Sequence, residues 1–326
     1  MSNKEFQELH EEELKTKKEE MNEKKEEATD SSEIKAIENP TGFKIVIREF
    51  KKDKLATFCF FFLVVLILTV FITSFLLPKE LYTKVDIFKK YAKPSFDSLW
   101  LIFGRGPGGT PILPYLLVGA RNSIAIGVTI TILTTVIGVS VGLIAGFYGG
   151  KVDTFIMRIV DFIGTLPTLM LIIVIASIWP RFDIKIFIIT MTIFYWIGTA
   201  RLVRAKALSE AKRDYISASK TMGTSDIKIM LGGILPNISS IIIVDSILAL
   251  AGNIGIETSL TFLGFGLPLT TPSIGTLISY ATKPEIIQYK LYVWLPAAIF
   301  LLILMLSINY VGQALKRASD ARQRLG

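Results

Sequence analysis

Residues 55–77 form a run in which no side chain is charged, and this run constrains the fold more than any other feature of the sequence. A helix over this run would be about 35 Å long at about 1.5 Å per residue, which is enough to cross a lipid bilayer with some tilt. The run starts too late and is too long to be a cleavable signal peptide. We therefore expect a membrane-spanning helix here.

The composition agrees with a membrane protein, because 51% of the residues are hydrophobic and only 20% are charged. Further apolar segments predict five more spans. They cover residues 123–147, 162–179, 184–197 with its flanks, 238–265 and 291–311. The predicted fold class is an all-α polytopic membrane protein with six transmembrane helices.

Basic residues predict the orientation of these spans in the membrane. Five of them crowd the start of the first span, namely Lys44, Arg48, Lys51, Lys52 and Lys54. Because segments rich in Lys and Arg stay in the cytoplasm, the N-terminus is expected there. Six spans then place the C-terminus and the basic segment 201–235 in the cytoplasm as well. Residues 79–118 are expected outside, since the lysines of a loop this long carry little weight in the rule.

The chain is expected to divide into three parts. Residues 1–42 alternate Lys and Glu with few hydrophobic residues, which predicts a disordered, charged cytoplasmic tail. Residues 43–120 hold a juxtamembrane segment, the first transmembrane helix and an external loop. Residues 121–326 hold the other five transmembrane helices, with the cytoplasmic segment 201–235 between two of them.

The sequence contains one histidine, His10, and one cysteine, Cys59. These counts exclude an internal disulfide, a metal site built from histidines or cysteines, and nucleophilic catalysis by a Ser-His-Asp or Cys-His system. We therefore predict no catalytic, cofactor-binding or metal-binding residue on this chain.

Three glycines predict a close helix contact within the second expected span. Gly138, Gly142 and Gly146 recur every four residues, so they share one face of the helix. A smooth face of this kind lets a neighbouring helix approach closely. Packing therefore explains these glycines without a ligand.

The cytoplasmic segment 201–235 reads as two short helices around a turn. Gly223 stands where a helix C-terminus favours a residue that tolerates positive φ. Thr224 or Ser225 can cap the second helix, and Asp226 is favourable in its first turn.

The first of these two helices has an apolar face. Tyr215, Ala218 and Met222 share that face, and Arg213, Ser217 and Lys220 point away from it. A soluble hairpin that exposes such a face between two spans predicts a cytoplasmic partner that covers it.

Several motifs of this sequence resemble one family. The spacing of Ser217-Ala218-Ser219, Gly223 and Leu235-Pro236 is similar to the EAA motif of binding-protein-dependent ABC importer permeases. Other matching stretches are residues 119–123 (GARNS), 145–150 (AGFYGG), 257–266 (ETSLTFLGFG) and 309–312 (NYVG). Together they resemble the C-type permease subunit of the oligopeptide/dipeptide/nickel group, from about residue 43 to the end. Ser217 and Ser219 depart from the motif, where Glu and a second Ala are usual.

The resemblance implies a type I ABC importer fold and a role as the transmembrane permease of an ATP-driven importer. The expected partners are a second homologous permease, two ATP-binding subunits and an extracellular solute-binding protein that delivers oligopeptides or dipeptides. ATP and Mg would bind on the ATPase subunits, so this chain would hold no cofactor and would not itself be an enzyme. The hairpin would be the coupling helix, with contacts to an ATPase from Asp214, Tyr215, Ala218, Ser219, Met222, Gly223, Thr224 and Ser225.

Two alternatives remain open at this stage. A permease for nickel or another small solute belongs to the same group, although the expected spans contain no histidine, a ligand that nickel favours. An ion-coupled secondary transporter would often show repeated halves with interrupted helices, and it would leave the hairpin unexplained.

Polar residues in the fifth expected span are candidates for the translocation path. Asp245, Asn253 and Glu257 share a loosely common helical face, and Asp245 would lie about 14 Å below Pro236. Charged groups at such a depth usually face protein or a water-filled cavity. Asp245 would then influence the choice of cargo or pair with a basic residue of the second permease.

Overall fold

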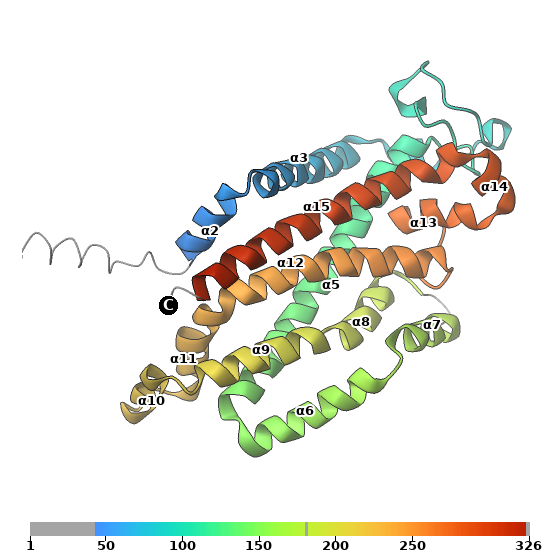
Figure 1. The fold of residues 1–326 in the computed structure, drawn as a ribbon. Helices are drawn as coiled ribbons and strands as arrows, with labels where there is room; N and C mark the ends of the chain where they lie inside the picture. The colour runs from blue at the N-terminus through green and yellow to red at the C-terminus, as the bar shows by residue number, and fades with distance from the viewer. Residues whose placement is uncertain (1–42, 180–181, 324–326) are drawn as a thin grey trace, which may run out of the picture. The chain divides into compact units, whose positions relative to one another are not determined.

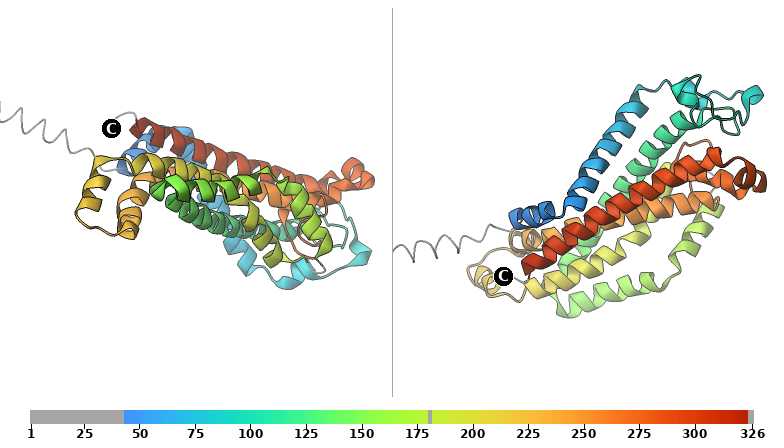
Figure 2. Two further views of the ribbon diagram at one scale, coloured as in Figure 1. Left: turned by 90° about the horizontal axis from the view of Figure 1, so that it is seen from below. Right: turned by 45° about the horizontal axis from the view of Figure 1, so that its top comes forward.

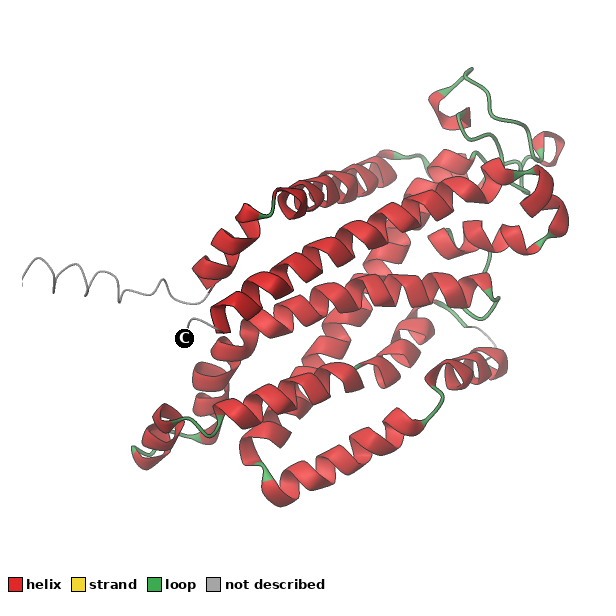
Figure 3. Ribbon diagram, viewed as in Figure 1, coloured by secondary structure: helices red, strands yellow, loops and turns green. Residues whose placement is uncertain are grey.

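The computed structural model describes residues 43–179 and 182–323, in which helices predominate (Figures 1 and 3). The chain divides into two units, residues 1–47 and 48–326, and the membrane-spanning helices belong to the second. The tail expected at residues 1–42 lies outside the described residues. In the described ranges the only β-type pairing is one isolated bridge between Arg105 and Pro111.

Five helical stretches are long and apolar enough to cross a membrane. They are Lys54–Leu76 (α3), Ile112–Tyr148 (α5), Ile184–Glu210 (α8 and α9), Asp226–Phe262 (α11 to α12) and Leu291–Asp320, which lies within α15 (Leu291–Gln323). A sixth candidate is the pair α6 (Gly150–Thr165) and α7 (Thr168–Ile178), which meet at an angle of 71°. The described part of the chain therefore has five spans, or six with the bent pair, which confirms the predicted fold class.

The remaining elements are short and lie before the first span or between spans. They are α2 (Phe43–Lys52), α4 (Lys79–Thr83), η1 (Ile87–Lys89), η2 (Leu99–Leu101), α10 (Asp214–Thr221), α13 (Ile274–Ser279), η4 (Tyr280–Thr282) and α14 (Pro284–Tyr289). Within the longer stretches, α8 covers Ile184–Tyr195, α9 Ile197–Glu210, α11 Asp226–Ile229, the π-helical turn η3 Met230–Ile234, and α12 Leu235–Phe262.

Five of the six spans differ in extent from the sequence prediction, and three of these differences have a clear structural basis or consequence. α5 begins at Ile112, so part of the expected external loop is helical. The prolines at its start are tolerated because the first turn of a helix needs no backbone donor there. The third span breaks at Leu166–Pro167, where the proline disfavours helical geometry in the residue before it. α9 continues to Glu210, so the first part of segment 201–235 extends the fourth span.

The glycine stripe of α5 packs directly against α9, as predicted. A Cβ atom added at Gly138 would lie 2.8 Å from the Trp196 carbonyl oxygen. One added at Gly142 would lie 2.5 Å from the Ala200 carbonyl oxygen. The two backbones therefore approach more closely than any larger residue would allow.

The two ends of the bundle carry different connections (Figures 1 and 2). The α10–α11 hairpin lies at one end, and the short helices α13 and α14 lie at the other. The long connection from α3 to α5, which contains α4, is also at this second end. Tyr292 at the start of α15 donates its phenol hydrogen to the carbonyl oxygen of Tyr91 at 2.7 Å and so fastens that connection.

We predict that Gly142→Ala destabilises the protein. The added methyl would be forced against the backbone of α9, and overpacking of this kind costs about 1–3 kcal/mol. Gly252→Ala in α12 is the matched control, because no atom lies within 4 Å of the Cβ position there. Thermal melting of the detergent-purified protein should give a lower Tm for the first variant only. If Gly142→Ala melted at the same temperature as the unsubstituted protein, the close α5–α9 contact would be contradicted.

We also predict that the hairpin faces the cytoplasm. A Lys212→Cys change in a Cys59→Ser background should resist a membrane-impermeant maleimide in intact cells and react after permeabilisation. Lys84→Cys, in the external connection, should react in both cases. Labelling of position 212 in intact cells would place the hairpin outside the cell and contradict the predicted topology.

Candidate functional site

The turn between α10 and α11 forms as the sequence predicts. Gly223 has φ of 79°, the left-handed conformation that glycine adopts without strain. Its N–H donates to the Lys220 carbonyl at 3.0 Å, and the N–H of Thr224 donates to the Ser219 carbonyl at 3.1 Å. These two bonds are those of a Schellman motif, which ends a helix at a glycine.

The start of α11 lacks the side-chain cap for which the sequence offered Thr224 or Ser225. Ser225 occupies the N-cap position, but its side chain makes no capping hydrogen bond. Asp226 lies in the first turn, where its charge favours the helix N-terminus. The hairpin is therefore closed by backbone bonds around Gly223 rather than by a side-chain cap.

One side of the hairpin packs into the bundle. Ile216 from α10 and Ile229 from α11 are buried in a cluster with Val203 of α9 and Phe147 at the end of α5. The Lys220 ammonium lies 4.3 Å from the centre of the Phe147 ring, within range of a cation–π interaction. The hairpin is thus fixed to α5 and α9 rather than hanging free.

The other side of the hairpin exposes large apolar residues. Met222 is 78% exposed and Ile227 is 65% exposed, and Ala218 is exposed beside them. Among the other predicted coupling residues, Asp214, Gly223, Thr224 and Ser225 are also exposed, and Ser219 is half-buried. Large apolar side chains exposed at this turn between two spans indicate a surface that a partner covers.

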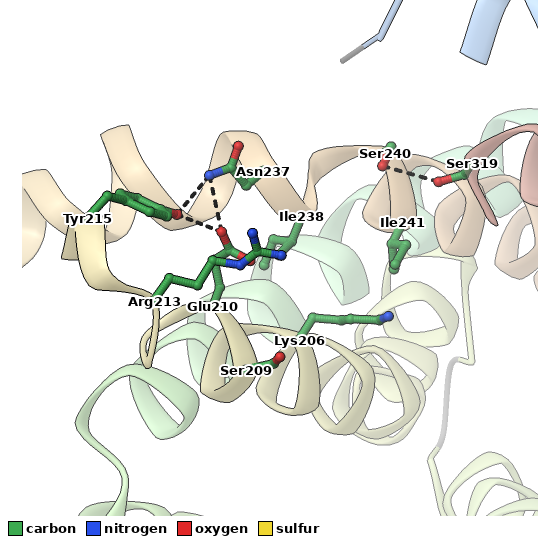
Figure 4. Close-up of a pocket in the computed structure, with 10 residues that line it drawn as sticks. All are labelled: Lys206, Ser209, Glu210, Arg213, Tyr215, Asn237, Ile238, Ser240, Ile241 and Ser319. Carbon is green, nitrogen blue, oxygen red and sulfur yellow. Dashed lines mark hydrogen bonds and ion pairs between the residues drawn. The ribbon is translucent and has the colours of Figure 1, made fainter. Parts of the chain in front are cut away.

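Tyr215 makes side-chain contacts that the sequence did not predict. Its phenol donates to Glu210 Oε1 at 2.6 Å and accepts from Asn237 Nδ2 at 2.8 Å (Figure 4). Asn237 Nδ2 also lies 3.3 Å from Glu210 Oε1, so the three side chains form a closed triangle. Burial and the hydrogen bond to Glu210 raise the pKa of Tyr215, which keeps the phenol protonated as a donor. The triangle joins the end of α9, the start of α10 and the start of α12.

A polar pocket of about 430 Å³ opens beside this triangle (Figure 4). Its walls come from α9, α10, α12 and α15. They consist of Lys206, Ser209, Glu210, Arg213, Tyr215, Asn237, Ile238, Ser240, Ile241 and Ser319. In the described ranges, no group of three or more His, Cys, Asp or Glu side chains is placed to hold a metal ion.

The three candidates for the translocation path lie in different surroundings. Asp245 is half-buried, accepts a hydrogen bond from Thr199 Oγ1 at 2.7 Å and lines a pocket of about 270 Å³. Asn253 is buried and donates to Thr131 of α5 at 2.9 Å. Glu257 is fully buried and accepts from Ser123 of α5 at 2.9 Å.

The expectation of one shared face is therefore wrong for this helix. Each step of four residues rotates a side chain by about 40°, so Asp245 and Glu257 differ by about 120°. Asn253 and Glu257 face α5 within this chain, and of the three candidates Asp245 is the one that lines a pocket.

Two ion pairs join α6 to α9 and were also missed. Arg204 holds Asp153 with both ends of its guanidinium, with Nε 2.6 Å from Oδ1. Arg201 Nη2 lies 2.9 Å from Asp161 Oδ1. The sequence contained these charges, but nothing in it showed that they pair across 40 and 51 residues.

Comparisons with known proteins give a consistent result. Residues 138–325 match the family described as binding-protein-dependent transport system inner membrane component. Residues 41–94 match the N-terminal TM domain of oligopeptide transport permease C.

Named relatives agree with these matches. The chain is 46% identical over 275 residues to the oligopeptide transport system permease protein OppC of Lactococcus lactis subsp. lactis (strain IL1403), covering 84% of this chain and 93% of the relative. It is 33% identical to OppC of Bacillus subtilis (strain 168), covering 86% and 90%. It is 34% identical to the dipeptide transport system permease protein DppC of Lactococcus lactis subsp. cremoris (strain MG1363), covering 73% and 68%.

The fold is also similar to a solved structure. A chain of the MetNI methionine ABC transporter in an inward-facing conformation superposes with a TM-score of 0.53 at 19% identity. The match covers 64% of this chain and 98% of the other.

We predict that Gly223→Val abolishes transport but leaves membrane insertion intact. A β-branched residue at this φ costs about 1–2 kcal/mol and opposes the turn that presents the exposed face. Gly223→Asn is the matched control, because asparagine tolerates the left-handed region, and it should retain most uptake. Near-normal uptake by the valine variant would show that the turn is a passive connection.

Proposed function

The chain belongs to the family of binding-protein-dependent transport system inner membrane components, and we propose that it imports oligopeptides or dipeptides as one permease subunit of an ATP-driven transporter. The single observation that carries this proposal is the hairpin, which joins two spans and exposes Met222 and Ile227. The proposed cargo rests on the peptide permeases to which most of the chain is similar.

The proposed assembly contains a second homologous permease, two ATP-binding subunits and an extracellular solute-binding protein. ATP hydrolysis takes place on the ATP-binding subunits, and this chain converts their movement into movement of helices. The N- and C-termini and the hairpin are on the cytoplasmic side in this arrangement. The exposed apolar residues of α10 and α11 are the proposed contact with one ATP-binding subunit.

Rigid connections on both sides of the hairpin support this transmission. On one side, α10 follows α9, which packs against the glycine stripe of α5. On the other side, α11 continues through η3 into α12. The triangle of Glu210, Tyr215 and Asn237 ties both sides together. A displacement of the hairpin therefore moves α9 and α12 together.

Two ion pairs connect α6 to α9, one of the helices that move with the hairpin. Arg204 and Arg201 of α9 hold Asp153 and Asp161 of α6. The Arg204–Asp153 pair is the more buried of the two, and separating a buried pair leaves costly unpaired charges. We infer that α6 follows α9 when the hairpin moves.

Asp245 is the residue of this chain that we assign to cargo preference. Its carboxylate lines the pocket that also contains Lys206, Lys316 and Asp320 between α9, α12 and α15. Charged side chains within a span are retained where they face protein or a water-filled cavity. A negative charge on the path would favour peptides that carry positive side chains.

We predict that Asp245→Asn lowers uptake of Lys- and Arg-containing peptides by about fivefold, the factor that about 1 kcal/mol of attraction supplies. Uptake of neutral and acidic peptides should change little, and ATPase activity of the assembled transporter should be retained. Asp97→Asn, in the external connection, is the control for loss of one negative charge. A proportional change for all three peptide classes would mean that Asp245 does not line the path.

The same reconstituted assay tests the function itself. Proteoliposomes that contain the whole transporter and its binding protein should accumulate a labelled peptide when ATP is present with the ATP-binding subunits. Accumulation of nickel or of another small solute, without peptide uptake, would show that this solute is the cargo instead of peptides. Peptide uptake that is driven by an ion gradient in the absence of ATP would contradict the proposal of an ATP-driven importer.

A further inference from the structure

Glu257 is a fully buried carboxyl group near the end of α12 that the transport mechanism above does not use. It contacts Ser123 of α5 and lies five residues before the end of α12, ahead of the connection to the short helix α13. A buried group of this kind is costly unless its oxygens accept hydrogen bonds, so its partners indicate what it does.

Both carboxyl oxygens accept from hydroxyl groups. Ser123 Oγ on α5 donates to Oε2 at 2.9 Å, and Thr261 Oγ1, one turn further along α12, donates to Oε1 at 3.1 Å. Thr258 Oγ1 adds a longer contact of 3.4 Å to Oε2. Both oxygens of Glu257 are therefore bound by hydroxyl groups.

Each of the two close hydroxyls is held in turn by a backbone amide of the α12–α13 connection. The N–H of Ile274 donates to Ser123 Oγ at 3.1 Å. The N–H of Leu267 donates to Thr261 Oγ1 at 3.1 Å. Because these oxygens already accept from an amide, their own hydrogens are directed to Glu257. Two chains of hydrogen bonds, called relays below, thus hold this part of the chain. Each runs from a backbone amide through one hydroxyl group to one oxygen of Glu257.

The connection is also pressed closely against α5 and α12. A Cβ atom on Gly119 of α5 would lie 2.9 Å from the Ser273 carbonyl carbon, and one on Gly275 would lie 2.7 Å from Thr261 Cβ. Asn122 of α5 donates to the Pro272 carbonyl at 2.8 Å. These contacts and the two relays hold the same short stretch of chain against α5 and α12.

We propose that Glu257 is a positioning residue that fixes the α12–α13 connection to α5, so that the ends of α5 and α12 opposite the hairpin move as one body during transport. The part that concerns transport rests on the proposed function. A carboxyl group suits this role because each of its oxygens accepts one hydroxyl. The amide of glutamine offers one acceptor and a donor, so one relay must break.

Hydrogen exchange at two amides tests the positioning directly, in the assembled transporter without cargo. In Glu257→Gln, exchange at one of the two amides, Leu267 or Ile274, should become about tenfold faster or more, as loss of the buried hydrogen bonds of one relay predicts. Ser123→Ala should speed exchange at Ile274 only, and Thr261→Val at Leu267 only. Glu80→Gln, an exposed glutamate of α4, is the control and should change neither amide.

The two single-relay variants keep the test decisive if Glu257→Gln assembles poorly. Acceleration at both amides in each of them would indicate general loosening and would overturn the two-relay arrangement. Unchanged exchange at both amides in Glu257→Gln would overturn it as well. Because no cargo is present, these outcomes do not depend on whether peptides are the substrate.

A kinetic measurement tests the role in transport. Glu257→Gln should lower the maximal rate of ATP-driven uptake by about tenfold while the KM for the cargo stays within about twofold. A raised KM with an unchanged maximal rate would place Glu257 in contact with the cargo and contradict the positioning role. Unchanged kinetics with accelerated exchange would remove the claim that the two helix ends must move together.

Discussion

The close approach of α5 and α9 is the contact on which the other parts of the site depend. Gly138, Gly142 and Gly146 remove the side chains that would separate the two backbones. Between helices in a lipid environment there is little hydrophobic driving force, so dense packing of small residues supplies much of the attraction. The hairpin begins where α9 ends, and it packs against Phe147 near the end of α5. The position of the exposed apolar face is therefore set by this helix pair.

Polar side chains within the spans are bound in two distinct ways. Glu257 and Asn253 are buried and bond to hydroxyl groups of α5, so they hold helices together. Asp153 and Asp161 pair with arginines of α9, which ties a further helix to the same unit. Asp245 accepts one hydroxyl hydrogen bond and borders a pocket that Lys206, Lys316 and Asp320 also line. Interactions within this chain thus account for the buried Glu257 and Asp153, whereas Asp161 is exposed.

Features that depend on a few neighbouring residues could be predicted from the sequence. The turn at Gly223 follows from a glycine at the end of a predicted helix, and the structure gives it the expected positive φ. The stripe on α5 follows from glycines that recur every four residues. The triangle of Glu210, Tyr215 and Asn237 could not be predicted, because Asn237 is 22 and 27 residues from the other two and nothing local pairs it with them. The expected common face of Asp245 and Glu257 was wrong, because a rotation of about 40° at each step of four residues adds up to about 120° between them. The break at Pro167 had a visible signal in the proline, but the apolar run around it favoured an unbroken span.

Site-specific cross-linking tests most directly whether the hairpin passes movement from an ATP-binding subunit to the bundle. Met222, with 78% of its surface exposed, would be changed to cysteine in a Cys59→Ser background and treated with a short bifunctional reagent in the intact transporter. We expect a covalent product with an ATP-binding subunit whose yield changes when ATP is added, and loss of uptake once it forms. A transport-competent complex in which position 222 never links to that subunit would contradict this role of the hairpin.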